Sequence, residues 1–225
     1  MRGEIQDIRK SYGRKAVLRG ASFPVHSGGC AGIVGANGSG KSTLLRVLAG
    51  VLRPEGGRFL WEGTDLLADR AAAERTVAYV PQGTPLIGEL SALDNLRLWY
   101  DRDAMQASLD HGVLRELGVH EFLKTPAAKL SGGMRKRLSI GCAMSGNPHI
   151  LLLDEPTAAL DLVCKEKLMA YFSAFRARGG LIILATHDLW ELECCDSLHL
   201  LSGGVLTPYA YDGDARRLAR EIERA

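Results

Sequence analysis

The stretch Gly35-Ala36-Asn37-Gly38-Ser39-Gly40-Lys41-Ser42-Thr43 decides the fold of this chain. It follows a short apolar run, residues 30–34, and it precedes a run with helical spacing that ends near Ala49. A strand that turns through glycines into a helix aims several backbone N–H groups, and the positive end of the helix dipole, at one point. Glycines allow this turn because they carry no Cβ and tolerate positive φ angles. The segment therefore predicts a loop that surrounds the phosphates of a nucleotide.

Two side chains of this loop have the chemistry that a nucleoside triphosphate requires. In loops of the pattern GxxxxGK[ST], the lysine reaches the β- and γ-phosphates and the hydroxyl ligates Mg²⁺. We assign these roles to Lys41 and Ser42. The expected nucleotide contacts are Gly35, Ala36, Asn37, Gly38, Ser39, Gly40, Lys41, Ser42 and Thr43.

Length and composition are those of an ordinary globular protein. The 225 residues are 46% hydrophobic and 24% charged, and the formal net charge is +2. The longest basic run is Arg135-Lys136-Arg137, so no nucleic-acid partner is expected. Residues 1–10 have no apolar core of a secretory leader, and no apolar run approaches a membrane span. Five cysteines without CxxC spacing favour a reduced, cytoplasmic chain.

Apolar patterning predicts an α/β core interrupted by a helical insert. The first third consists of strands and turns, and apolar residues then recur at helical spacing from about Leu86 to Gly146. Buried strands are expected at 149–153 and 181–185, a helix at 162–178, a hairpin at 198–206 and a surface helix at 215–223. We expect one domain, 1–225, in which 1–85 and 147–225 form the core and 86–146 the insert.

Two acids follow the predicted strand Ile150–Leu153. The carboxyl ends of strands in a parallel sheet carry the ligand site. Asp154 is expected to hold Mg²⁺ directly or through water, and Glu155 to polarise the attacking water.

A second anion site is predicted within the insert. Leu130-Ser131-Gly132-Gly133 precedes a helix, with Ser131 as its N-cap and two glycines that expose backbone N–H groups. One chain does not need two phosphate sites, so this one is expected to contact a nucleotide held by a partner copy.

Taken together, these segments resemble the ATP-binding cassette (ABC) ATPases, the nucleotide-binding subunits of ABC transporters. Residues 35–42 match the Walker A loop, Leu130–Gly133 the LSGG signature, and Asp154 with Glu155 the Walker B pair. The order and spacing match over nearly the whole chain. The remaining matches are Gln82 to the Q-loop, Ala159-Leu160-Asp161 to the D-loop, His187 to the switch histidine and Tyr12 to the adenine-stacking aromatic.

The resemblance implies a P-loop NTPase core of the RecA type, with an N-terminal antiparallel β subdomain and an inserted α-helical subdomain. It further implies two cassettes that enclose two ATP molecules head to tail, with Ser131, Gly132 and Gly133 on the partner's nucleotide and Asp161 at the interface. Catalysis would use Glu155, His187, Lys41 and Gln82, and Mg²⁺ would be held by Ser42, Gln82 and Asp154. The second cassette is either an identical copy or a paralogue.

The resemblance also implies that the chain binds integral membrane permease subunits at the cytoplasmic face of the membrane. The compact insert and the sequence LSGGMRKRL (residues 130–138) resemble those of exporter cassettes of the ABC-2 kind more than those of importer cassettes. Leu86, Ile87 and Leu90 are either a docking surface for that partner or core of the insert. The alternative function is a non-transport ABC ATPase, such as an iron–sulfur assembly factor; a regulator that does not hydrolyse is disfavoured by Glu155. Met134, Ala36 and Cys30 depart from common family residues without touching the phosphate chemistry.

Overall fold

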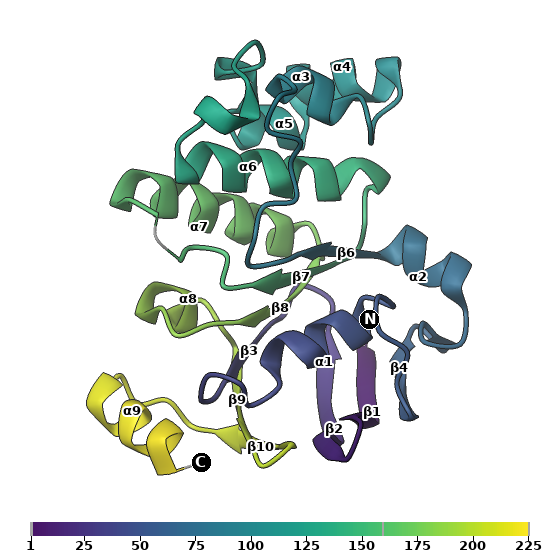
Figure 1. Cartoon of the computed structure of the whole chain (residues 1–225), viewed down its shortest axis with the longest axis vertical. Helices are drawn as coiled ribbons and strands as arrows, with labels where there is room; N and C mark the ends of the chain where they lie inside the picture. The colour runs from purple at the N-terminus through teal and green to yellow at the C-terminus, as the bar shows by residue number, and fades with distance from the viewer. Residues whose placement is uncertain (1, 159, 225) are drawn as a thin grey trace.

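The computed structural model describes residues 2–158 and 160–224 and contains two β-sheets with helices around them (Figure 1). The first sheet is antiparallel with the strand order β2-β1-β4-β5. Its strands are β1 (Arg2–Tyr12), β2 (Lys15–His26), β4 (Gly56–Trp61) and β5 (Thr64–Asp65). The turn between β1 and β2 contains Gly13 at φ 59°, a left-handed conformation that glycine adopts without strain. This sheet is the antiparallel β subdomain that the sequence predicted.

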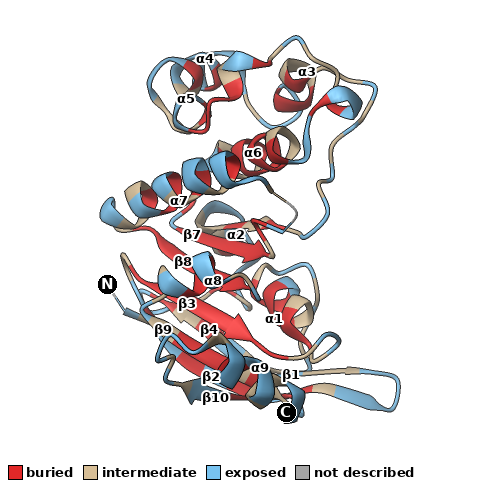
Figure 2. Cartoon of the chain, turned by 90° about the vertical axis from the view of Figure 1, so that its left-hand side faces the viewer, coloured by how far each residue is buried: buried red, intermediate tan, exposed pale blue. Residues whose placement is uncertain are grey.

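The second sheet has six strands in the order β10-β9-β3-β8-β7-β6. All its neighbouring pairs are parallel except β9 with β10 at one edge. Its strands are β3 (Cys30–Val34), β6 (Val77–Val80), β7 (Ile150–Asp154), β8 (Leu181–Ala185), β9 (Ser197–Ser202) and β10 (Val205–Tyr209). Strands β3, β7 and β8 are buried at every residue, as continuous apolar runs in a parallel sheet predict (red in Figure 2).

Two hydrophobic clusters cover the two faces of this parallel sheet. On one face, Ile150 and Leu152 pack with α1 (Lys41–Leu48) and with apolar residues of the antiparallel sheet. On the other, Leu151 and Leu153 pack with α6 (Gly132–Ala143) and α7 (Leu162–Ala177). Helix α1 therefore lies between the two sheets. The parallel sheet on which it packs is covered on both faces, and this packing holds the N-terminus of α1 in position.

The helices between β6 and β7 extend beyond the sheets at one end of the molecule (Figure 1). They are α3 (Ala92–Leu96), α4 (Arg102–His111), α5 (Val113–Glu116) and α6, with 3₁₀ turns at Val119–Glu121, Ala127–Lys129 and Met144–Gly146. Helix α6 also contacts α7 and β6, so the signature helix belongs to both the helical region and the core. The domain limits 86–146 stay a prediction.

Three further helices complete the described chain: α2 (Arg70–Thr76), α8 (Leu189–Glu193) and α9 (Ala215–Arg224). The sequence did not predict α2, which is a short alanine-rich helix without apolar periodicity. It forms because the Asp69 carboxylate accepts the Ala72 N–H at 2.9 Å and caps its first turn. Helix α9 is polar as expected, but its Leu218 is buried against Val34 and Leu192.

Candidate nucleotide-binding site

The phosphate loop joins β3 to α1 through backbone conformations that need glycine. Gly40 is the N-cap of α1 and has a φ of 113°. Gly35 has a φ of 155°, and a Cβ at this position would lie 2.5 Å from the Leu201 carbonyl oxygen. Side chains at either position would force the loop open, so these two glycines set its curvature.

A cavity of about 500 Å³ opens at this loop. It brings together four parts of the chain: strand β2, the phosphate loop with the start of α1, the residue after Pro81, and the residue after β7. Its lining residues are Val17, Asn37, Gly38, Gly40, Lys41, Ser42, Thr43, Gln82 and Glu155.

Lys41 is held in the loop by backbone carbonyls. Its Nζ donates to the Gly35 oxygen at 2.7 Å and to the Ala36 oxygen at 3.1 Å. Burial lowers the pKa of Lys41, whereas the charges of Glu155 and Asp154 raise it. A buried ammonium has three donors and seeks anionic partners, so phosphate oxygens are suitable ligands for it.

The loop also contains an unused donor. The Ser39 hydroxyl is buried, and no residue in the described part of the chain bonds to it. It lies one residue before Gly40, where the first N–H groups of α1 are free. An unpaired hydroxyl beside a helix N-terminus fits a phosphate oxygen.

The two predicted acids lie at the carboxyl end of β7 in different environments. Asp154 is 3% exposed and accepts a 3.5 Å hydrogen bond from the Tyr79 hydroxyl. Glu155 has a φ of 46°, which is left-handed and uncommon for a residue with a side chain. Its N–H donates to the Ala185 oxygen at 2.9 Å, so pairing with β8 holds the strained backbone in place. Such strain is stored preferentially at functional sites.

Gln82 and His187 both approach Glu155. The Gln82 Nε2 donates to Glu155 Oε2 at 2.7 Å, and the His187 Nε2 lies 4.0 Å from Glu155 Oε1. Burial and the nearby Lys41 charge lower the pKa of His187, which favours its neutral form at pH 7. Glu155 is therefore the point where three separate loops meet.

The oxygen donors expected for Mg²⁺ are the Ser42 hydroxyl, the Gln82 amide and the Asp154 carboxylate. Mg²⁺ prefers hard oxygen ligands and uses one or two carboxylates together with phosphate oxygens and water. Ser42 and Gln82 line the same cavity, and Asp154 directly precedes Glu155 of its lining. The donor set fits the ion.

Other predicted site residues lie away from this cavity. Tyr12 is half exposed at the end of β1, with the Lys10 ammonium 5.8 Å above its ring, and it does not line the cavity. Ser131 and Gly132 are exposed at the start of α6, where the Ser131 hydroxyl accepts the Met134 N–H at 3.2 Å. Asp161 caps α7 by accepting the Cys164 N–H at 2.8 Å. Ala159 lies outside the described residues.

Sequence reasoning missed two residues that contact predicted site residues. The Tyr79 hydroxyl donates to Asp154, and the Lys136 Nζ donates to the Pro81 and Gln82 oxygens, each at 3.1 Å. For Lys136 a signal existed. It lies three residues after Gly133 and four before Ile140, a spacing that puts it on the buried face of α6.

Comparison with known proteins identifies the family. The family profile described as ABC transporter matches residues 18–158, which is more than half of the chain. The chain belongs to the ABC transporter family. The expected ABC-type ATPase cassette is thereby confirmed at the level of the family.

The ABC cassette is similar to curated subunits of bacterial export and resistance systems. It is 33% identical to the Nod factor export ATP-binding protein I of Rhizobium etli over 206 residues, which cover 89% of this chain and 65% of that protein. It is 30% identical to the linearmycin resistance ATP-binding protein LnrL of Bacillus subtilis, covering 89% of this chain and 66% of that protein. The chain therefore spans about two thirds of the length of these relatives.

Solved ABC cassettes have the same fold. An ATP-binding subunit of an ABC transporter superposes with a TM-score of 0.85 at 27% identity, covering 99% of this chain and all of that one. A nucleotide-free cassette gives a TM-score of 0.83 at 23% identity, covering all of this chain and 96% of that one, and it supports the fold alone. Residues 2–158 and 160–224 contain no helix with the length and apolarity needed to cross a bilayer.

Proposed function

We propose that this chain hydrolyses ATP with Mg²⁺ and thereby powers an ABC transporter of the export type. The observation that carries the proposal is the convergence on Glu155, a strained residue contacted by Gln82 and His187 beside the Lys41 loop. A carboxylate next to a phosphate-binding loop suits a general base that orients water for attack on the γ-phosphate.

Each site residue has a role that its position supports. Lys41, the loop N–H groups and Thr43 would bind the phosphates. Ser42, Asp154 and Gln82 would hold Mg²⁺, whose positive charge would offset that of the transferred phosphoryl group. Neutral His187 would donate a hydrogen bond to the γ-phosphate. The half-exposed Tyr12 ring is available to stack on adenine.

Turnover of ATP by the purified chain tests the proposal. We expect phosphate release that requires Mg²⁺ and is abolished by Lys41→Ala, because the loop loses the ammonium that binds the β- and γ-phosphates. A Lys124→Ala control removes an exposed lysine of the helical region and should leave turnover unchanged. Turnover that persists in Lys41→Ala would contradict the assigned site.

We further propose that the active form is a dimer of cassettes. Ser131, Gly132 and Gly133 lie outside the phosphate-loop cavity of their own chain, and Ser131 and Gly132 are exposed at a helix N-terminus. The exposed Ser131 and Gly132 are free to contact the γ-phosphate of a nucleotide bound to a second cassette, with buried Gly133 beside them and Asp161 at the same interface. A dimeric cassette with ADP and Pi bound is among the solved structures of this fold.

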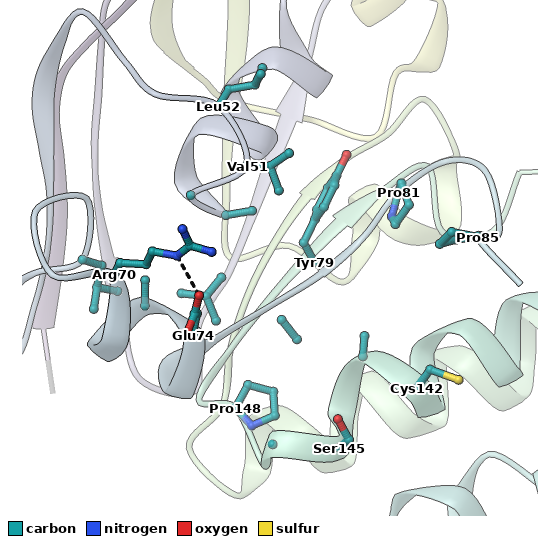
Figure 3. A pocket seen from close by; sticks show the side chains of 18 of the residues that line it. Val51, Leu52, Arg70, Glu74, Tyr79, Pro81, Pro85, Cys142, Ser145 and Pro148 are labelled. Atoms are coloured by element: carbon teal, nitrogen blue, oxygen red, sulfur yellow. Dashed lines mark hydrogen bonds and ion pairs between the residues drawn. The ribbon is translucent and has the colours of Figure 1, made fainter. Parts of the chain in front are cut away.

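A second, larger cavity is proposed to receive the membrane subunit. It has a volume of about 1250 Å³ and lies between the end of α1, helix α2, strand β6 and helix α6 (Figure 3). Val51 and Trp99, which are 62% and 59% exposed, line it together with Leu86. Leu86 also packs against the hydrophobic core, as the core interpretation of this segment expects, and docking at Leu86 is part of the present proposal. The occupant we propose is a short amphipathic segment of a permease subunit at the cytoplasmic face of the membrane.

Co-purification from native membranes in mild detergent tests this docking. We expect a multi-spanning protein in near-equal amount with the wild-type chain. Val51→Glu should reduce its recovery at least tenfold, because the change places a charge on the apolar part of the lining that Val51, Leu86 and Trp99 form. Val205→Glu is the matched control, since Val205 is 44% exposed and lies outside the cavity. Recovery of soluble partners alone, with the chain absent from membranes, would support the iron–sulfur assembly alternative instead.

A further inference from the structure

Lys136 is an unusual buried charge. Its side chain is 4% exposed, and among the described residues no carboxylate forms an ion pair with it. Lysine is almost never fully buried without a partner, because removing the ammonium from water is costly. Burial lowers the pKa of Lys136, while the charges of Asp154, Glu191 and Glu155 raise it. The contacts of Lys136 must therefore offset the cost of burying its ammonium group.

Its contacts connect the signature helix to the Gln82 loop. The Lys136 Nζ donates to the backbone oxygens of Pro81 and Gln82 at 3.1 Å each. The Gln82 side chain in turn donates to Glu155 Oε2 at 2.7 Å. Two hydrogen-bonded steps thus join α6 to the carboxylate at the end of β7.

The signature residues Gly132 and Gly133 are on the same helix as Lys136. Lys136 lies four residues after Gly132, about one helical turn or roughly 6 Å along the axis. Gly133 is in close contact with α7, since a Cβ there would meet the Cys164 sulfur at 2.3 Å. Because Lys136 and the signature residues belong to the same helix, a rigid-body movement of α6 would displace the signature and the Gln82 carbonyl together.

We propose that Lys136 is a positioning residue for ATP hydrolysis, which fastens the Gln82 loop to the signature helix and so sets the position of the Gln82 amide relative to Glu155. Engagement of the signature by a partner's nucleotide would shift α6, and Lys136 would transmit that shift to Gln82. In this structure the Gln82 amide donates to a Glu155 oxygen that the attacking water needs. The inference rests on the proposed ATPase function.

Lys136→Met tests it, because methionine keeps the length of the side chain and removes its donors. We expect kcat to fall about tenfold, as is typical when an outer-sphere partner is lost, with the Kd for ATP changed less than about twofold. Lys136→Arg should recover part of the rate, since it restores buried donors. Lys124→Met makes the same substitution at an exposed lysine of the helical region and should match the wild type.

A double-mutant cycle identifies the route of the effect. In a Gln82→Ala background, Lys136→Met should lower kcat by less than about twofold, because its action through Gln82 is already lost. An equal loss in both backgrounds would overturn the inference and assign Lys136 to the stability of α6. So would a kcat for Lys136→Met equal to that of Lys124→Met.

Hydrogen exchange separates this inference from the function on which it rests. Peptides that cover residues 81–87 should exchange faster in Lys136→Met than in Lys124→Met, whether or not the chain turns over ATP. Equal exchange would overturn the fastening by Lys136. Absence of wild-type turnover, with faster exchange in the variant, would contradict the ATPase proposal while supporting the connection.

Discussion

Glu155 shows how a single residue carries both a structural cost and the proposed chemistry. Its φ of 46° places the backbone in the left-handed region, and the Ala185 carbonyl keeps it there. A non-glycine residue in such a conformation costs roughly 1–3 kcal/mol. The cost is tolerated because the side chain must reach Gln82, His187 and the cavity from the end of a buried strand.

Replacing Glu155 with glycine should therefore stabilise the fold relative to replacing it with alanine. Both variants lose the carboxylate and turnover, but only alanine keeps the strained Cβ. We expect Glu155→Gly to exceed Glu155→Ala by about 1 kcal/mol in free energy of unfolding, measured by urea denaturation. Equal stabilities would mean that position 155 stores no strain.

At the scale of elements, the close approach of α6 to α7 sets the position of the signature residues. Helix α6 begins with two glycines, and the second of them lies against α7. Gly133 is thus required for packing in addition to its proposed contact with phosphate. Buried Lys136 on the same helix donates to the Pro81 and Gln82 carbonyls, so we expect the Gln82 loop to move with this helix.

Gly133→Ala should destabilise the protein by roughly 1–3 kcal/mol through overpacking. The inserted methyl group would lie 2.3 Å from the Cys164 sulfur and 2.8 Å from its Cβ. In a Cys164→Ala background the penalty should be smaller, because the nearest atom has been removed. Thermal denaturation of the four proteins in this cycle measures the difference, and an unchanged penalty would contradict the packing argument.

At the scale of the whole molecule, the phosphate-loop cavity and the signature residues that we propose to contact a nucleotide lie apart in one chain. The phosphate-loop cavity contains Lys41 and Glu155 but none of Ser131, Gly132 and Gly133. A second cassette in the opposite orientation would complete both sites, and the γ-phosphate would bind only that closed state. Hydrolysis would then open the dimer by removing the bridging ligand.

Glu155→Gln should accordingly accumulate an ATP-bound dimer. Glutamine keeps the shape of the side chain but does not accept the water proton, so ATP remains bound while the interface stays closed. Size-exclusion chromatography with Mg²⁺ and ATP should show a dimer for this variant and a monomer for Glu155→Gln with Lys41→Ala. Only monomer in the presence of ATP would count against a homodimeric sandwich.

The sequence by itself determined the features that depend on neighbouring residues. Glycine spacing specified the phosphate loop, continuous apolar runs specified β3, β7 and β8, and Asp154 with Glu155 were placed at a strand end because they follow such a run directly. Caps such as Ser131 and Asp161 were predictable for the same reason, since a cap and its helix are adjacent in the chain.

Only the tertiary structure decided the contacts that join distant segments. Gln82 and Glu155 are 73 residues apart, and Lys136 is 54 residues from the Gln82 oxygen to which it donates. No pattern of neighbouring residues predicts either contact, because each depends on how the sheet and the helical region fold onto one another. The left-handed backbone of Glu155 is of the same kind, since the hydrogen bond that maintains it comes from β8. Local propensity selects the elements of this cassette, whereas long-range packing determines which of its polar groups meet.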